Sequence, residues 1–193
     1  MYEDGLGVIQ DSSEAVKWYR LAADQGLAEA QNNLGFIYES GHGVIQDYGE
    51  AVKWFRLAAK QGHAPAQNNL GAIYEEGLGV TKDYREALKW LRLAADQGYA
   101  LAQANLSNMY IVGLGVTQDY GEAFKWCRLA AEQGLAHDQH NLGAMYDNGL
   151  GVTKDHQEAL KWLRLAANQG YQEAIDTLKN WERSGLKKGH RHN

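Results

Sequence analysis

This sequence has little of what a disulfide-linked, membrane-spanning or strand-rich protein needs. Its 193 residues include one cysteine and one proline. A single cysteine excludes a disulfide within the chain, and no apolar run approaches the roughly 18 residues of a membrane span. No segment alternates apolar and polar residues as a half-buried strand does. The sequence therefore predicts an all-α protein without membrane insertion.

Basic residues are also scarce in most of the chain. The net charge is -5, and residues 1–178 hold 14 Lys and Arg against 23 Asp and Glu, whereas residues 179–193 carry five bases and one acid. Nucleic-acid binding needs clustered Lys and Arg, so the acidic body argues against such a partner. No signal peptide opens the sequence, which with the single cysteine favours a cytoplasmic location. A periplasmic location stays open for a chain truncated at its N-terminus.

What the chain does have is a repeat of 36 residues. It is marked by Trp18, Trp54, Trp90, Trp126 and Trp162, and by Gly26, Gly62, Gly98, Gly134 and Gly170. A period of this length indicates a solenoid, in which each repeat buries its apolar face against its neighbours. We predict one repeat domain over residues 1–184, followed by a flexible basic tail at 185–193. The domain comprises a partial repeat 1–26, full repeats 27–62, 63–98, 99–134 and 135–170, and a capping helix 171–184.

Each repeat is predicted to form two helices, named helix A and helix B. In the first full repeat, apolar residues at helical spacing predict helix A at about 28–40, ended by Gly41. Asp47, with Glu50 three residues later, predicts a capping box at the start of helix B, which runs to Gly62. The same pair recurs as Asp11/Glu14, Asp83/Glu86, Asp119/Glu122 and Asp155/Glu158.

Small residues set how closely the helices approach. Gly35 lets helix A and helix B come together, while Leu34 and Trp54 fill the space between them. Ser107 replaces this glycine in the third full repeat, and we interpret it as a tolerated small residue and not a nucleophile. Cys127 occupies a position held by apolar residues in the other repeats, which predicts a buried thiol.

The string YEEGLGVTKDYREALKWLRLAADQG, residues 74–98, resembles the Sel-1-like repeat, a relative of the tetratricopeptide repeat with a slightly longer unit. The resemblance extends from Met1 to about Ser184. It implies a right-handed superhelix of antiparallel helix pairs, and adaptor or scaffold work in protein complexes. Bacterial relatives rich in cysteine link each repeat with a disulfide, which this chain cannot do.

The repeats differ from one another mostly along one face of helix A. In the resembling tetratricopeptide architecture this face lines the concave groove, so we predict that it binds a partner. The predicted groove residues are Glu29, Asn32, Phe36, Glu39, Asn68, Glu75, Glu76, Leu101, Asn108, Ile111, Val112, His137, His140 and Asp147.

Ile111 and Val112 stand where the other repeats have acids or small polar residues. Together with Leu101 they predict an apolar floor in the groove, beside the acidic Glu39 and Glu75. A protein segment with an apolar anchor and Lys or Arg flanks would complement this surface. The alternative is that Ile111 and Val112 pack on the next repeat.

Three other patterns are interpreted as structural. The recurring Gly-x-Gly follows helices and lacks the lysine of a phosphate loop, so it predicts turns. His137 and His140 lie three apart without a cysteine nearby, so neither a metal site nor a cofactor is expected. The Lys and Arg of each helix B, such as Lys53 and Arg56, follow the capping glutamate by three and six residues, which predicts surface salt bridges.

The sequence thus predicts a non-catalytic scaffold or adaptor that binds another protein. No Ser or Cys, His and carboxylate set recurs with catalytic spacing. Two alternatives stay open, namely a hydrolase-type enzyme, as suggested for some related repeat proteins, and a regulatory segment of a larger protein. We also expect the first helix B to leave an apolar face uncovered around Val16, Tyr19 and Ala23, so that this end self-associates or belongs to a longer protein.

Overall fold

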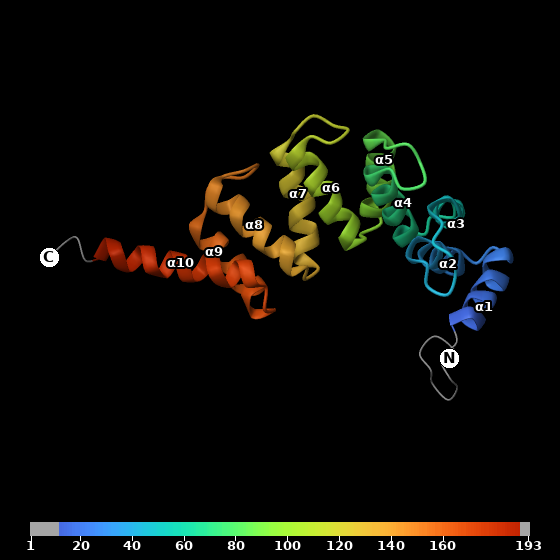
Figure 1. The fold of residues 1–193 in the computed structure, drawn as a ribbon. Coiled ribbons are helices and arrows are strands. Elements are labelled where there is room, and N and C mark those ends of the chain that lie inside the picture. Colours follow the sequence, from blue (N-terminus) through green and yellow to red (C-terminus); the bar gives the residue numbers. More distant parts are fainter. Residues whose placement is uncertain (1–11, 190–193) are drawn as a thin grey trace. The chain divides into compact units, whose positions relative to one another are not determined.

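The computed structural model describes residues 12–189, and the side chains of residues 14–183. Every regular element in this part of the chain is a helix (Figure 1). The predicted all-α solenoid of helix pairs is confirmed, because equivalent helices begin 36 residues apart. The helices are α1 (Ser12–Asp24), α2 (Ala28–Ser40), α3 (Tyr48–Lys60), α4 (Ala64–Glu76), α5 (Tyr84–Asp96), α6 (Ala100–Val112), α7 (Tyr120–Glu132), α8 (Ala136–Asn148), α9 (His156–Asn168) and α10 (Gln172–Gly189).

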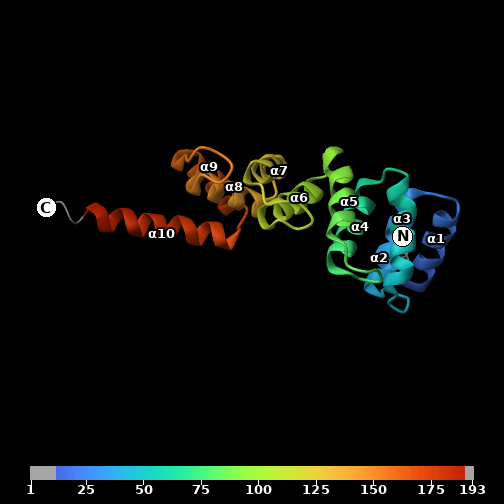
Figure 2. The ribbon, with the colours of Figure 1, turned by 90° about the horizontal axis from the view of Figure 1, so that it is seen from above.

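The chain forms two compact units, residues 1–102 and 103–193, named unit 1 and unit 2. In unit 1, each helix from α1 to α5 packs on the next, and in unit 2 the same holds from α7 to α10 (Figures 1 and 2). The sequence predicted one domain over residues 1–184. The boundary at residue 102 lies within α6, where the repeat pattern continues unbroken and so gives no sign of it.

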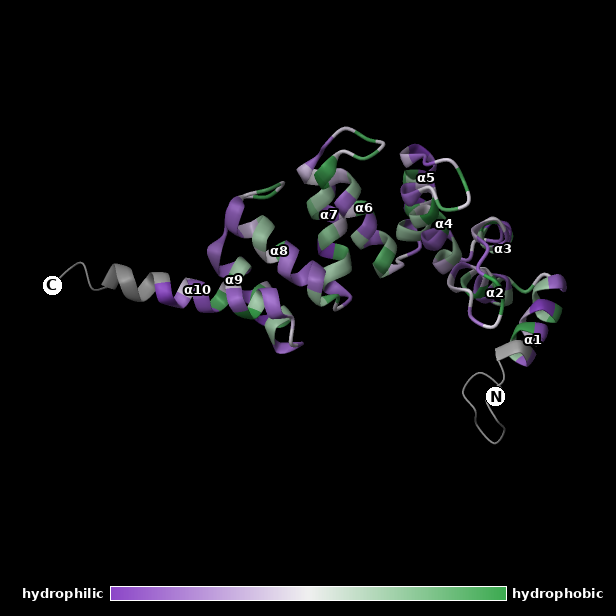
Figure 3. Ribbon diagram, in the orientation of Figure 1, coloured by the Kyte–Doolittle hydropathy of each residue, from purple (hydrophilic) through white to green (hydrophobic). Residues whose placement is uncertain are grey.

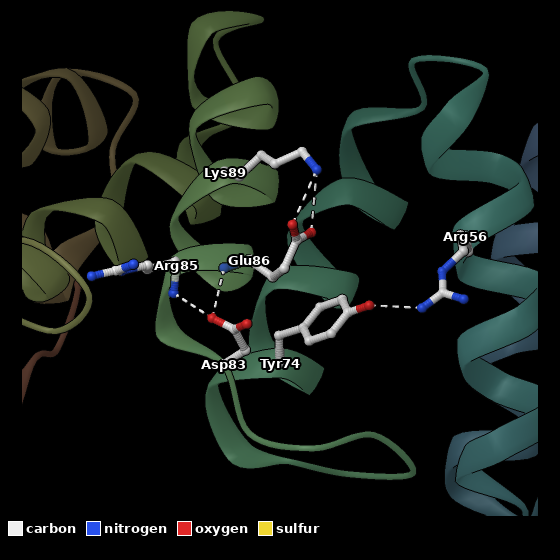
Figure 4. A network of polar contacts seen from close by, with 6 residues as sticks. All are labelled: Arg56, Tyr74, Asp83, Arg85, Glu86 and Lys89. Atoms are coloured by element: carbon white, nitrogen blue, oxygen red, sulfur yellow. Dashed lines mark hydrogen bonds and ion pairs between the residues drawn. The ribbon is translucent and has the colours of Figure 1, made fainter.

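In α3, α5, α7 and α9, the predicted aspartate caps the start of helix B. Asp83 accepts hydrogen bonds from the backbone N–H groups of Arg85 (2.9 Å) and Glu86 (3.2 Å), as Figure 4 shows. The glutamate half of the predicted capping box is wrong, because the Glu86 carboxylate binds Lys89 Nζ instead (3.2 Å). A lysine one turn along the exposed helix surface offers this carboxylate a charged partner. The predicted cap at Asp11 lies outside the described residues.

The helix A glycines act as predicted. A Cβ atom on Gly71 would lie 2.6 Å from Leu91 Cγ, and one on Gly35 would lie 2.7 Å from Phe55 Cδ1. Both facing side chains are fully buried. Helix A ends as expected, since Gly41 has φ +73° and donates its N–H to the Ile37 carbonyl at 2.9 Å.

Consecutive repeats are joined by buried glutamines, which the sequence analysis missed. Gln67 is 4% exposed. Its Nε2 donates to the Ala59 carbonyl of the preceding helix B (3.1 Å), and its Oε1 accepts from Gln97 Nε2 (2.7 Å). A buried amide needs hydrogen-bond partners, and here one side chain links three successive helices. Gln31 and Gln139 make the same pair of bonds.

The expectation for the first helix is wrong for two of its three residues. Val16 and Ala23 are buried in a cluster with Ala30, Leu34 and Ile37 of α2, and Tyr19 packs beside it. The exposed apolar side chains of α1 are instead Trp18 (57%) and Leu21 (52%). They occupy the other side of the helix, away from α2.

The closing helix is longer than predicted. It continues to Gly189, five residues beyond the expected end at 184 and into the expected tail. A single glycine in a helix costs only about 1 kcal/mol, and no proline follows position 171, so the helix does not have to stop. Hydrophilic and hydrophobic residues alternate around each helix (Figure 3), and none of the described helices is long and apolar enough to cross a membrane.

Candidate partner-binding faces

The predicted groove residues lie on α2 and α4 in unit 1, on α6, and on α8 in unit 2. We call the part formed by Glu29, Asn32, Phe36, Glu39, Asn68, Glu75 and Glu76 the unit 1 face. Leu101 belongs to unit 1 but lies on α6. The part formed by Asn108, Ile111, Val112, His137, His140 and Asp147 is called the unit 2 face.

The unit 1 face presents an aromatic side chain to solvent. Phe36 is 58% exposed, although aromatic rings are more often buried. Asn69 Nδ2 donates to Asn32 Oδ1 at 3.2 Å, which ties α4 to α2 beside it. Asn68 is only 7% exposed, so its side chain is largely covered. The face therefore combines an exposed ring with a row of amides.

Three carboxylates gather at the C-terminal ends of α2 and α4. Burial, followed by the charge of Glu76, raises the pKa of Glu39. Burial also raises the pKa of Glu75, with Glu76 adding to the effect and Lys82 opposing it. The last turn of a helix already carries partial negative charge from its free carbonyls. The arrangement therefore concentrates negative potential at one end of the unit 1 face.

The unit 2 face presents an aliphatic side chain. Val112 is 56% exposed, which disagrees with the alternative that it packs on the next repeat. Ile111 is partly buried, and its backbone carbonyl accepts a hydrogen bond from Gln118 Nε2 at 2.6 Å. Leu101, assigned to unit 1, is 49% exposed. Val112 is the residue of the predicted apolar floor that unit 2 leaves most open to a partner.

The histidines of α8 contact an aromatic ring. The rings of His137 and His140 lie 6.1 and 5.5 Å from the ring of Tyr171, measured between centroids. Burial lowers the pKa of His140. Asp147 bonds His156 Nδ1 through its Oδ1 at 3.1 Å. Within the part of the chain that the structure describes, no group of three or more His, Cys, Asp or Glu could hold a metal ion.

Cys127 and Ser107, the two side chains that the sequence analysis weighed as nucleophiles, are buried. Cys127 is fully buried, and burial, then the charge of Asp138, raises its pKa to about 12. The thiolate is the nucleophilic form, so this thiol is not activated. Ser107 is 2% exposed and donates its hydroxyl to the Ala123 carbonyl at 2.9 Å. Both residues act in packing, as predicted.

The basic residues of helix B are engaged with neighbours. The lysines pair with the glutamate three residues before them, as in Lys161 with Glu158 (3.2 Å). Arg56 donates instead to the hydroxyl of Tyr74 on the next helix A (2.7 Å; Figure 4). The predicted salt bridges are thus confirmed for the lysines, whereas Arg56 bridges neighbouring repeats.

The Sel1 repeat family model matches this chain five times, at residues 1–27, 28–63, 64–99, 100–135 and 136–171. A comparison with curated proteins finds no match. Among solved structures, a protective antigen of uropathogenic Escherichia coli strains, described as displaying an SLR fold, is 42% identical with a TM-score of 0.91, over 96% of this chain. This chain spans only 40% of the length of that protein.

Two further structures are similar. A Sel1 repeat protein from Oxalobacter formigenes is 41% identical with a TM-score of 0.86, over 92% of this chain and 73% of its own. An immunity protein from Pseudomonas aeruginosa is 21% identical with a TM-score of 0.57, over 90% of this chain and 66% of its own. At that identity the second likeness concerns the fold alone.

Proposed function

Because this chain belongs to the Sel1 repeat family, we propose that it is a non-catalytic scaffold that binds a segment of another protein on its helix A surfaces. The observation that carries this proposal is that exposed apolar side chains and acidic side chains lie on the same face of helix A. In unit 1, Phe36 is 58% exposed on the face that also carries Glu39 and Glu75.

The chemistry of the unit 1 face favours a segment with an aromatic or aliphatic anchor and basic flanks. Burying Phe36 against an apolar anchor removes hydrocarbon surface from water, which is the main source of affinity. Lys or Arg beside the anchor would neutralise Glu39 and Glu75, whose pKa values are raised by burial and then by the charge of Glu76. Charge complementarity of this kind adds specificity and faster association.

The unit 2 face differs in chemistry. Val112 offers an aliphatic contact, and the charged Asp147 is already bonded to His156. We propose that this face binds through apolar contact, whereas the unit 1 face binds through an apolar anchor and charge recognition. The two faces are therefore tested by separate variants.

Selection of short random peptides displayed on phage tests the proposal directly. With the wild-type chain as bait, we expect enriched peptides to share an apolar residue flanked by Lys or Arg. Phe36→Ser and Glu75→Gln should abolish enrichment of these peptides, whereas Leu57→Ser should not. Leu57 is a matched control, since it is 46% exposed but lies on helix B.

Val112→Glu and Leu165→Glu form the corresponding pair in unit 2, because Leu165 is 40% exposed on the helix B α9. Val112→Glu should weaken binding of those selected peptides that bind the unit 2 face, and Leu165→Glu should leave their binding unchanged. Equal effects of the helix A and helix B variants, or enrichment of acidic peptides, would overturn the proposed binding mode.

A second proposal concerns self-association. The exposed Trp18 and Leu21 form an apolar patch on α1. The tryptophan at the same position in the next repeat, Trp54, is partly buried against the cluster that includes Leu34 and Ile37. This position is thus one that the fold covers elsewhere, and we propose that a second copy of α1 covers it here.

A further inference from the structure

Three residues of unit 2 differ in chemistry from their counterparts in the other repeats, at positions that the fold buries. They are Ser107 on α6, Cys127 on α7 and Asp138 on α8, exposed by 2%, 0% and 3%. The counterparts of Ser107 are Gly35, Gly71 and Gly143, with Lys179 on α10; those of Cys127 include Phe55, Leu91 and Leu163, and those of Asp138 are Ala30, Ala66, Ala102 and Ala174. We call these three residues the polar core cluster.

The changes compensate one another in volume. Serine and aspartate are larger than the glycine and alanine that they replace, whereas cysteine is smaller than phenylalanine or leucine. Cys127 Sγ donates to the backbone carbonyl of Asp138 at 3.4 Å, and the Ser107 hydroxyl donates to the Ala123 carbonyl at 2.9 Å. Close packing tolerates swaps that keep the total volume, so the small thiol makes room for the other two side chains.

Asp138 places an ionisable side chain in the buried polar core cluster. Its Oδ2 lies 3.7 Å from Nδ1 of His137, whose side chain is 64% exposed. Burial raises the pKa of Asp138, while His137 and a backbone hydrogen bond oppose the rise. Asp138 is also the third residue of α8, where the helix dipole favours negative charge. The carboxylate is thus held in the core by partners that only partly offset its desolvation.

We propose that Asp138 makes the packing of α7 on α8 pH-sensitive, so that its carboxylate destabilises unit 2 near neutral pH and ceases to do so as the medium is acidified. This regulation is additional to partner binding and does not depend on it. No other full repeat has an ionisable side chain at this position, so the effect is confined to one seam between repeats.

Proton binding determines whether Asp138 stabilises or destabilises the fold at a given pH. A carboxyl group whose pKa is raised by folding binds its proton more tightly in the folded state than in the unfolded state. Its destabilising contribution is therefore present in full above the raised pKa of Asp138. The contribution shrinks as the pH falls through that pKa, and it vanishes below the ordinary value of 3.8.

The other ionisable groups near the polar core cluster do not share the effect of Asp138 on the pH dependence of stability. Cys127 on α7 keeps its proton throughout this range. His140 on α8 has a lowered pKa, so it destabilises the fold as the pH drops below its ordinary 6.5. Tyr171 and Glu173 face α8 from the start of α10. Residues 103–112 of α6 contain no charged residue, and on α9 Glu158 pairs with Lys161. These groups are the same in the wild type and in an Asp138 variant. The difference between the two melting temperatures at each pH therefore reports on Asp138.

Thermal unfolding of the full chain, followed by circular dichroism, tests the proposal at about pH 7.5 and about pH 4.5. Asp138→Ala places in α8 the residue that the other repeats carry, so it should fold. We expect this variant to melt about 2–4 °C above the wild type at the higher pH, and the difference to be smaller at the lower pH. Asp138→Asn should share the pH trend, because it removes the charge and keeps the shape.

Asp176→Ala is the matched control, since Asp176 on α10 is 57% exposed and its loss should leave the difference from wild type unchanged between the two pH values. A lower melting temperature for Asp138→Ala at about pH 7.5 would overturn the proposal. A difference of the same size at both pH values would overturn it as well. Neither measurement involves a binding partner, so this inference and the scaffold proposal fail independently.

Discussion

Glycine inside a helix normally weakens it, yet Gly35, Gly71 and Gly143 recur in the middle of helix A. The structure gives the reason, because a Cβ atom on Gly71 would lie 2.6 Å from Leu91 Cγ and 3.3 Å from the Ala87 carbonyl. Both neighbours belong to helix B of the same repeat. The loss of helix propensity is offset by the closer packing that these glycines permit.

Gly71→Ala should therefore destabilise the protein, by about 1–3 kcal/mol, even though alanine is the better helix former by about 1 kcal/mol. Urea unfolding followed by circular dichroism would measure this change in the free energy of unfolding. The penalty should shrink in a Leu91→Ala background, where the facing side chain is cut back. An equal penalty in both backgrounds would locate the strain elsewhere.

Individual residues were predictable where they obey a common rule. Gly35 and Cys127 were placed in the core because small or apolar residues recur at their positions. Gln67 was missed, since a glutamine is usually exposed and only the structure shows its partners in two neighbouring helices. The departure of Asp138 from alanine was visible in the repeat comparison, but its burial is evident only from the structure.

The helices B α3, α5, α7 and α9 each begin with an aspartate that satisfies free N–H groups of the first turn, and this contact was readable from the spacing alone. In α5 the Asp83 carboxylate accepts from Arg85 and Glu86 (Figure 4). The partner of the capping glutamate was not readable, because Glu86 can reach either its own helix start or Lys89 one turn on. In the structure, Glu86 pairs with Lys89.

Asp83→Ala should lower the free energy of unfolding by about 1 kcal/mol, the usual cost of losing a helix N-cap. Asp83→Asn retains an acceptor oxygen and should recover most of this loss. Chemical denaturation of the wild type, Asp83→Ala and Asp83→Asn in parallel would measure the three free energies of unfolding. If asparagine were as damaging as alanine, the negative charge and not the hydrogen bonds would be the stabilising feature.

At the scale of the whole molecule, the sequence was most informative about the number of helices and their order along the chain. The 36-residue period predicted the helices and their pairing, because every repeat repeats the same signals. It could not predict the division at residue 102, since no break in the pattern accompanies it. The proposed binding faces were indicated by variation among repeats, which identifies positions free of packing constraints but not the partner that uses them.

Self-association could in principle join copies end to end or in closed pairs. End-to-end growth would require α10, a helix A, to receive the α1 helix B of another copy. The α10 position equivalent to Gly35 is Lys179, whose side chain is 58% exposed. A single Cβ atom on Gly35 would already lie 2.7 Å from Phe55, so Lys179 blocks a helix B from the same close approach. The structure therefore favours a closed pair formed through α1.

We accordingly predict a monomer–dimer equilibrium in sedimentation equilibrium, with no larger species as concentration rises. The contact would bury Trp18 of both copies, and an aromatic anchor at a symmetric contact acts twice. Trp18→Lys should shift the protein to monomer, because it replaces the anchor with two facing like charges, whereas Leu93→Lys should not. Leu93 is a suitable control, since it is 43% exposed on α5. Species that keep growing with concentration would show that α10 does accept a helix B, and a wild-type chain that stays monomeric throughout would rule out the contact at α1.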